Sequence, residues 1–169
     1  MAFLKLLGRT NIVDRYERGE MSATDFYDHF VRETGFRGAF DQFARIWRSI
    51  FRENTPMIDF AWTLKPRFPI YLLTNASDLH VPWVFENYPR LRFFEGYASS
   101  FDMKATKPER LFYERAIAHL KIDPSTCLFV DDRPDNVEAA EAFGIRSILY
   151  TEAGETIMRM SGVLNLESP

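Results

Sequence analysis

The first 65 residues place hydrophobic side chains at helical spacing, and this pattern predicts three helices. The first begins at Ser22 and stops before Gly35, a residue that commonly follows the end of a helix. The second runs from about residue 40 to 51. The third opens at Thr55-Pro56, with threonine as the N-cap and proline at the first helical position. One face of the second helix is expected to carry Phe43, Ile46, Trp47 and Ile50.

After Pro66 the pattern changes to short apolar runs, which are typical of buried parallel strands. The runs cover residues 68–73, 127–130 and 145–150, and a fourth short strand is expected at 97–100. Helices are predicted between them at 108–120 and 134–143. Strands that alternate with helices indicate an α/β fold with a parallel, Rossmann-like sheet.

Two of the predicted strands end in polar pairs, Thr74-Asn75 and Asp131-Asp132. Ligands of parallel sheets bind at the carboxyl ends of the strands, so these pairs are expected to share one site. Adjacent ionised carboxylates repel each other unless a cation neutralises them, and Mg²⁺ prefers oxygen ligands. Asp131 and Asp132 are therefore a candidate magnesium site. The same pair also suits an ordinary turn or N-cap before the next helix.

Thr74 and Asn75 supply a hydroxyl and an amide near a possible helix start, where backbone N–H groups favour a phosphate. An ordinary polar turn has the same composition. Lys107 precedes Pro108 at a helix start, where a cation opposes the helix dipole and calls for a reason. Neutralising a phosphate would supply that reason, and a solvated surface lysine is the alternative.

The composition narrows the class of partner. The net charge is -3 with no basic tract, which argues against nucleic acid and anionic membrane as partners. Cys127 is the only cysteine, so no intrachain disulfide is possible and a reducing compartment is expected. Lys5 interrupts the apolar start of the chain, and no run reaches the length of a signal peptide or membrane span. We therefore expect a soluble, cytoplasmic protein.

Three segments taken together resemble the motifs of the haloacid dehalogenase-like (HAD-like) hydrolases. Residues 72–77 (LLTNAS) resemble motif II, 105–109 (ATKPE) motif III and 129–140 (FVDDRPDNVEAA) motif IV, in the family's order. Residues 16–22 resemble the start of the helical cap in the branch of the glucose-1-phosphatases and the phosphatase domain of soluble epoxide hydrolases. This resemblance implies a small helical cap at 1–53 and an α/β core at 54–169.

The resemblance also implies roles for the polar residues. Thr74 and Asn75 would hold the phosphoryl oxygens, Lys107 would neutralise the phosphorylated intermediate, and Asp132, with Asp131 beside it, would bind Mg²⁺. The family reaction is hydrolysis of a phosphomonoester through an aspartyl-phosphate, in which the metal and the lysine stabilise charge. The implied partner is a small phosphorylated metabolite such as a sugar phosphate.

The family's first motif, an apolar strand ending in Asp-x-Asp, has no counterpart, because the 169 residues contain no Asp-x-Asp. Asp14 lacks the second aspartate and is expected to be a helical surface residue. The absent strand lies in the middle of the family's sheet, so its neighbours would be left with unpaired backbone groups. Re-pairing, a segment of another chain, or a strand formed by residues 2–7 would close the gap. Otherwise the chain is a truncated form of a longer enzyme.

These observations predict a HAD-like phosphatase that has weak or no turnover by itself, because the family nucleophile is missing. Two alternatives remain open. The chain is a non-catalytic binding or regulatory module, or it is one chain of a two-chain enzyme. Each alternative would be accompanied by a homodimer or by a partner that donates a strand.

Overall fold

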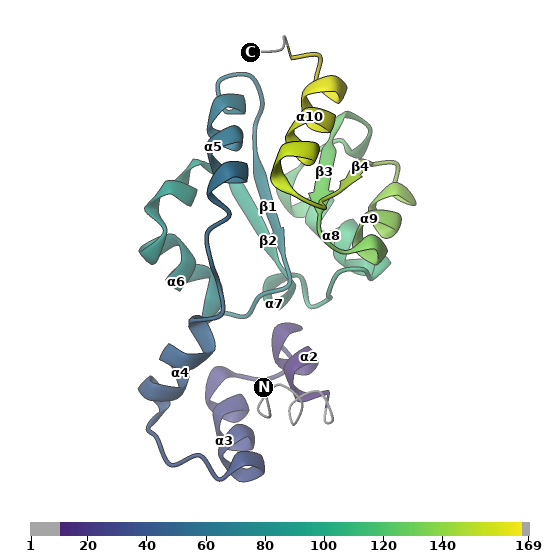
Figure 1. Ribbon diagram of the computed structural model, residues 1–169. Coiled ribbons are helices and arrows are strands. Elements are labelled where there is room, and N and C mark those ends of the chain that lie inside the picture. The colour runs from purple at the N-terminus through teal and green to yellow at the C-terminus, as the bar shows by residue number, and fades with distance from the viewer. Residues whose placement is uncertain (1–10, 167–169) are drawn as a thin grey trace.

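The structure is a computed structural model that describes residues 11–166, and the chain forms a helical part followed by an α/β part (Figure 1). The helical part contains α2 (Ile12–Glu17), α3 (Ala23–Thr34) and α4 (Phe40–Arg48). Ser22 caps α3 as predicted, since its hydroxyl accepts a hydrogen bond from the Asp25 N–H at 3.1 Å. Gly35 ends this helix with a left-handed backbone, φ 69°, which glycine adopts without a steric penalty.

Aromatic side chains form the core of the helical part. Tyr16 stacks on Phe26 with ring centroids 4.4 Å apart, and Trp47 packs edge-on against Phe26 at 4.8 Å. The face predicted for α4 is only partly correct, because Phe43 and Trp47 are buried while Ile46 is 50% and Ile50 60% exposed. Ile50 lies beyond the end of α4, so helical spacing no longer sets its direction, and Ile46 lies at the edge of the apolar stripe.

The α/β part alternates helices and strands, which confirms the predicted fold class. Its longer elements are α5 (Thr55–Leu64), β1 (Tyr71–Thr74), α6 (His80–Asn87), β2 (Gly96–Ser99), α8 (Arg110–Leu120), β3 (Leu128–Asp131), α9 (Pro134–Glu141), β4 (Arg146–Leu149) and α10 (Ala153–Val163). The short helices are η1 (Pro89–Phe93), α7 (Ser100–Met103) and η2 (Pro124–Thr126). The four predicted strands are confirmed with shifts of one to three residues at their starts.

The strands form two separate parallel pairs. In the first pair Tyr71 of β1 lies opposite Gly96 of β2, and in the second Leu128 of β3 lies opposite Arg146 of β4. Within residues 11–166, β1 and β3 do not pair with each other, so direct re-pairing does not close the sheet. Figure 1 shows the two pairs side by side with a space between β1 and β3.

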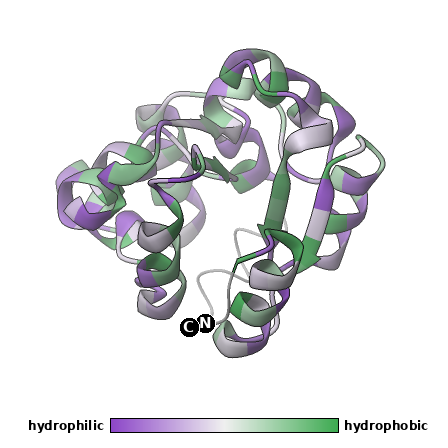
Figure 2. Cartoon of the chain, turned by 90° about the horizontal axis from the view of Figure 1, so that it is seen from above, coloured by the Kyte–Doolittle hydropathy of each residue, from purple (hydrophilic) through white to green (hydrophobic). Residues whose placement is uncertain are grey.

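Hydrophobic side chains hold these two pairs together from the face covered by α8. Phe112, Tyr113 and Ala116 of this helix are fully buried, and Leu73 of β1 and Phe129 of β3 pack against the same cluster. Seen from above, β1 and β3 are largely hydrophobic, whereas the helices carry both hydrophobic and hydrophilic sides (Figure 2). The helix thus bridges the gap that the strands leave open.

Two sequence predictions remain untested by this architecture. The proposed strand at residues 2–7 lies outside the described residues, and the boundary between a cap and a core after residue 53 stays a prediction. Among the helices of the described part, none combines the length and the apolar character needed to span a membrane.

Candidate active site

The carboxyl ends of β1 and β3 meet at Lys107, which lies in the loop between α7 and α8. The Lys107 Nζ donates a hydrogen bond to the Leu73 carbonyl oxygen of β1 at 2.9 Å. The same nitrogen lies 2.6 Å from Oδ2 of Asp131, the last residue of β3. Only 9% of the Lys107 side chain and 7% of the Asp131 side chain are exposed. The space between the two strand pairs is therefore spanned at its carboxyl end by a buried ion pair.

Asp131 is held by three donors. Its Oδ1 accepts hydrogen bonds from the Asn136 Nδ2 at 2.8 Å and from the Arg133 N–H at 3.0 Å. Burial alone would raise the pKa of Asp131, but the Lys107 charge and these hydrogen bonds outweigh it and hold the pKa below its ordinary value. Asp131 therefore stays ionised at neutral pH, and its negative charge fixes the position of the lysine.

Asn75 positions Lys107 through the backbone. Its Oδ1 accepts a hydrogen bond from the Lys107 N–H at 2.8 Å, and its Nδ2 donates to the Lys107 carbonyl oxygen at 2.9 Å. The Asn75 backbone N–H and the Thr74 hydroxyl form no hydrogen bond within the described residues, and Thr74 is half-buried at the end of β1. The predicted residues Thr74, Asn75, Lys107 and Asp131 thus lie together.

Asp132 follows Asp131 directly but makes none of its contacts within the described residues. The residue is exposed and makes no hydrogen bond or ion pair within residues 11–166. The described residues hold no group of three or more His, Cys, Asp or Glu side chains arranged for a metal. Mg²⁺ is commonly bound by one or two carboxylates together with water and phosphate oxygens. The donors present are compatible with that arrangement, but they are too few to hold the ion by protein groups alone.

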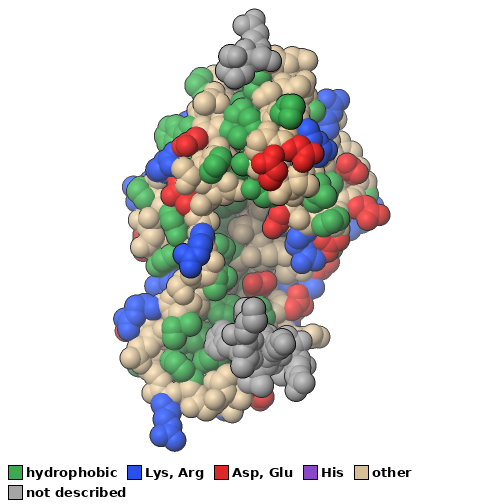
Figure 3. All heavy atoms as spheres, viewed as in Figure 1, with side chains coloured by type: hydrophobic (Ala, Val, Ile, Leu, Met, Phe, Trp, Pro, Cys, Tyr) green, Lys and Arg blue, Asp and Glu red, His purple; other side chains and the backbone are tan. Residues whose placement is uncertain are grey.

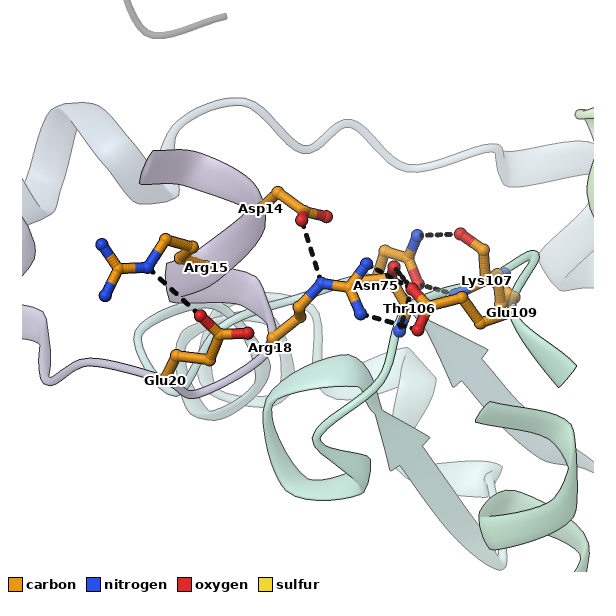
Figure 4. A network of polar contacts seen from close by, with 8 residues as sticks. All are labelled: Asp14, Arg15, Arg18, Glu20, Asn75, Thr106, Lys107 and Glu109. Carbon is orange, nitrogen blue, oxygen red and sulfur yellow. Dashed lines mark hydrogen bonds and ion pairs between the residues drawn. The ribbon is translucent and has the colours of Figure 1, made fainter. Parts of the chain in front are cut away.

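A chain of polar contacts joins the helical part to this site (Figure 4). Arg18, at the end of α2, donates to Asp14 Oδ2 at 2.9 Å and to Glu109 Oε2 at 2.6 Å. Glu109 in turn accepts a hydrogen bond from the Thr106 hydroxyl at 2.5 Å, directly before Lys107. Asp14 is a partly exposed helical residue, as predicted from the sequence. Arg18 and Glu109 therefore link the end of α2 to the loop that carries the lysine.

Sequence reasoning did not identify Arg18 or Asn136 as contributors to this arrangement. From the sequence, Asn136 and Asp135 are expected either to join the metal ligands or to lie in solvent, whereas in the structure the Asn136 side chain orients Asp131. Arg18 and Glu109 are 91 positions apart, and no local pattern marks such a pair. Asp135, the other residue considered near the pair, turns outward to Arg133. On the molecular surface, a hollow separates the helical part from the α/β part in the face seen in Figure 3.

Comparison with known proteins relates this chain to a family of hydrolases. The pattern that defines the haloacid dehalogenase-like hydrolases matches residues 56–144. A D-ribitol-5-phosphate phosphatase from Bacteroides thetaiotaomicron is 22% identical, over 93% of this chain and 80% of that protein. A sesquiterpene phosphatase from Aspergillus oryzae is 27% identical, over 87% of this chain and 76% of its own length.

Solved structures of the same family have a similar fold. A HAD family enzyme from Bacteroides thetaiotaomicron has a TM-score of 0.78 at 26% identity, covering 96% of this chain and 84% of that one. The same enzyme has been solved as a magnesium complex, with a TM-score of 0.78 at 27% identity over 89% of this chain and 79% of that one. A HAD-like hydrolase from Porphyromonas gingivalis has the same fold, with a TM-score of 0.78 at 24% identity, covering 98% and 83%.

Proposed function

We propose that this chain, which belongs to the haloacid dehalogenase-like hydrolase family, provides the phosphate-binding half of a phosphomonoesterase site. The observation that carries the proposal is the buried Lys107–Asp131 pair, 2.6 Å apart at the ends of β1 and β3. A lysine ammonium has three donors. Two are used by Leu73 and Asp131, so a third remains for a phosphoryl oxygen.

Two neutral donors lie at the same strand end. The Thr74 hydroxyl and the Asn75 backbone N–H have no partner within the described residues, and both suit an anionic oxygen. Asn75 keeps the lysine loop in place through its side chain, and Asp131 orients the ammonium through their ion pair. These contacts support the binding and charge neutralisation of a phosphate before any chemistry takes place.

Magnesium belongs to the proposal as a weakly bound ion at Asp132, with Asp131 beside it. When bound, it would supply further positive charge for the phosphoryl group. Because Asp131 is committed to three protein donors, Asp132 supplies the uncommitted carboxylate. The family relatives act on a polyol phosphate in one case and on a sesquiterpene in another, so a small phosphorylated metabolite is the proposed substrate class.

We further propose that turnover by the chain alone is weak or absent, because its 169 residues contain no Asp-x-Asp. Within residues 11–166, β1 and β3 each have one edge without a neighbouring strand, which favours a second candidate function in which the chain works with a polypeptide that donates a strand. A cytoplasmic location remains a proposal that follows from the absence of a disulfide pair in the sequence.

An activity assay with three proteins tests this function. The chain alone, the chain preceded by an apolar strand ending in Asp-x-Asp, and the same strand ending in Asn-x-Asn are compared on a generic phosphomonoester with Mg²⁺. We expect metal-dependent turnover only in the Asp-x-Asp form, and at least a hundredfold less when Lys107→Met is added to it. Robust turnover by the chain alone that survives Asp14→Ala would contradict the proposed site.

Binding provides a second readout that does not depend on turnover. Calorimetry should show that inorganic phosphate binds the chain and that Lys107→Met abolishes this binding. Mg²⁺ should bind weakly, and Asp132→Asn should weaken it further while leaving the fold unchanged. Tight magnesium binding that is indifferent to Asp132→Asn would place the metal elsewhere.

A further inference from the structure

A cavity of about 190 Å³ lies between β1, the helices α5 and α6, and residues 51–54. Its walls are mainly apolar and include Ile58, Leu72, Val81, Val84 and Phe94. Thr74 also lines it. Leu72 and Thr74 are two positions apart on the same face of β1, so the cavity follows the strand inward for about 6.6 Å from its carboxyl end. The cavity therefore begins at the residue that is proposed to hold phosphate.

Most of the polar side chains that line this cavity already have partners. Asn54 donates to the Tyr150 hydroxyl at 3.0 Å, and the Tyr88 hydroxyl donates to the Phe51 carbonyl oxygen at 3.1 Å. His80 lines the wall, but burial lowers its pKa, and its ring nitrogens lie 3.1 Å from the Trp47 carbonyl oxygen and 3.3 Å from the Ser77 hydroxyl. The imidazole is thus neutral and already hydrogen-bonded. Glu53 is paired with Arg90 at 3.0 Å. Arg52, which also lines the cavity, forms no ion pair within residues 11–166. Arg52 therefore leaves an unpaired positive charge at the wall of the cavity.

We propose that this cavity is a subsite for the apolar group of a phosphomonoester substrate, whose phosphate is held at Thr74 and Lys107. The inference rests on the phosphate site proposed above and adds the chemical class of the leaving group. The substrate is the phosphate ester of an alkyl or isoprenoid alcohol, with its hydrocarbon running along β1 between α5 and α6.

The walls distinguish this class from polyol phosphates. The hydroxyl groups of a polyol would lose their hydrogen bonds to water among side chains such as Leu72 and Val84, which offer none in return. A hydrocarbon group has no hydrogen bonds to lose there. Apolar cavities of about 150 Å³ stay free of water and accept small apolar molecules. The volume is below the usual range for whole ligands, so it suits a short chain or the first part of a longer one.

The test compares ligands that share a phosphate and differ only in the hydrocarbon. Binding of inorganic phosphate, methyl phosphate, n-hexyl phosphate and n-hexanol to the full chain is measured by calorimetry. Each buried methylene favours binding, so we expect n-hexyl phosphate to bind at least tenfold more tightly than methyl phosphate. Val84→Phe, which fills the cavity, should remove this difference and leave methyl phosphate binding unchanged.

Ile46→Phe is the matched control, because Ile46 is half exposed on α4 and does not line this cavity. It should leave the tenfold difference intact. A smaller substitution, Val84→Leu, keeps the test valid if Val84→Phe does not fold, and should reduce the difference partially. Equal affinities for methyl and n-hexyl phosphate, or a difference that survives Val84→Phe, would overturn the inference.

The outcomes also separate this inference from the proposed phosphate site. If inorganic phosphate fails to bind while n-hexanol binds and is displaced by Val84→Phe, the phosphate site is wrong and the apolar cavity stands as a binding site. If methyl phosphate binds in a Lys107-dependent way and hydrocarbon length has no effect, the phosphate site stands and the apolar subsite is refuted.

Discussion

The core side chains of the helical part are more completely buried than those of strands β1 and β3 in the α/β part. In the helical part, Tyr16, Phe26, Phe30, Phe43 and Trp47 are all at most 5% exposed. In the α/β part, the hydrophobic residues of β1 and β3 are only half-buried, although parallel strands are normally covered on both sides. The apolar residues of these two strands are as hydrophobic as those of the helical core, so composition does not explain the difference.

The difference follows from where each element finds its backbone partners. A helix satisfies its own N–H and C=O groups internally, so the helical part needs only side-chain packing. A strand requires a neighbour on each side, and within residues 11–166 β1 and β3 have one neighbour each. Helix α8 and the Lys107–Asp131 pair connect the two halves without supplying those backbone bonds.

Supplying the missing neighbour should have the largest effect. We predict that an apolar strand of about five residues ending in Asn-x-Asn, joined in front of Met1, stabilises the protein by on the order of 5 kcal/mol through new ladder hydrogen bonds. This corresponds to a rise in Tm of about 10 °C or more for a chain of this size. Differential scanning calorimetry measures the shift, and a Gly/Ser extension of equal length is the control.

The edges of β1 and β3 that have no neighbouring strand within residues 11–166 also predict that the chain without the added strand associates with itself. Light scattering after size exclusion should show a dimer, a larger assembly or aggregation, and the added strand should convert it to a monomer. A monomeric unextended chain whose Tm does not respond to the added strand would mean that its edges are already covered.

The second prediction concerns the ion pair that spans the two halves. Lys107→Met leaves the buried Asp131 charge without its partner, and we expect a loss of about 3–5 kcal/mol in the free energy of unfolding. Hydrogen exchange should accelerate in β1 and β3 more than in α3. The double variant Lys107→Met/Asp131→Leu removes both charges and should recover most of the stability. Equal losses in the single and double variants would refute an electrostatic role for the pair.

The smallest effect is expected in the helical part, at Glu17. Burial and the nearby Asp14 charge raise the pKa of Glu17 to about 7. The folded state therefore binds a proton that the unfolded state has released, and stability falls as the pH rises from about 4.5 to 7. Glu17→Gln should leave stability at pH 4 unchanged and increase it at pH 8 by up to about 3 kcal/mol. Urea unfolding at the two pH values measures this, and an equal effect at both would contradict a raised pKa.

Much of the local structure was predictable from the sequence. Ser22 and Gly35 mark the two ends of α3 because a capping side chain and a left-handed glycine act within a few residues. The apolar runs at β1, β3 and β4 were recognised for the same local reason. Helix α10 was not predicted, because Gly154 and Gly162 weaken its helical signal. For α6, which contains Pro82, the sequence indicated only a possible helix start after Asn75, without bounds.

The residues of the candidate site were also visible in the sequence, but their relations were not. Position at strand ends and the family resemblance singled out Thr74, Asn75, Lys107 and Asp131, because chemistry at the carboxyl ends of parallel strands depends on order along the chain. The role of Asn75 as a clamp on the Lys107 backbone depends on two loops that are 32 positions apart.

The sequence by itself determined most of the elements, their parallel order, the family and the absence of an Asp-x-Asp pair. Only the tertiary structure decided that β1 and β3 do not pair with each other within residues 11–166 and that Lys107 bridges them. It also decided that Arg18 connects α2 to the same loop and that an apolar cavity begins at Thr74. The physical reason is how far apart along the chain the interacting residues are. Helix caps and strand patterns depend on neighbours in sequence, whereas strand pairing, buried ion pairs and cavities depend on which distant segments meet in space.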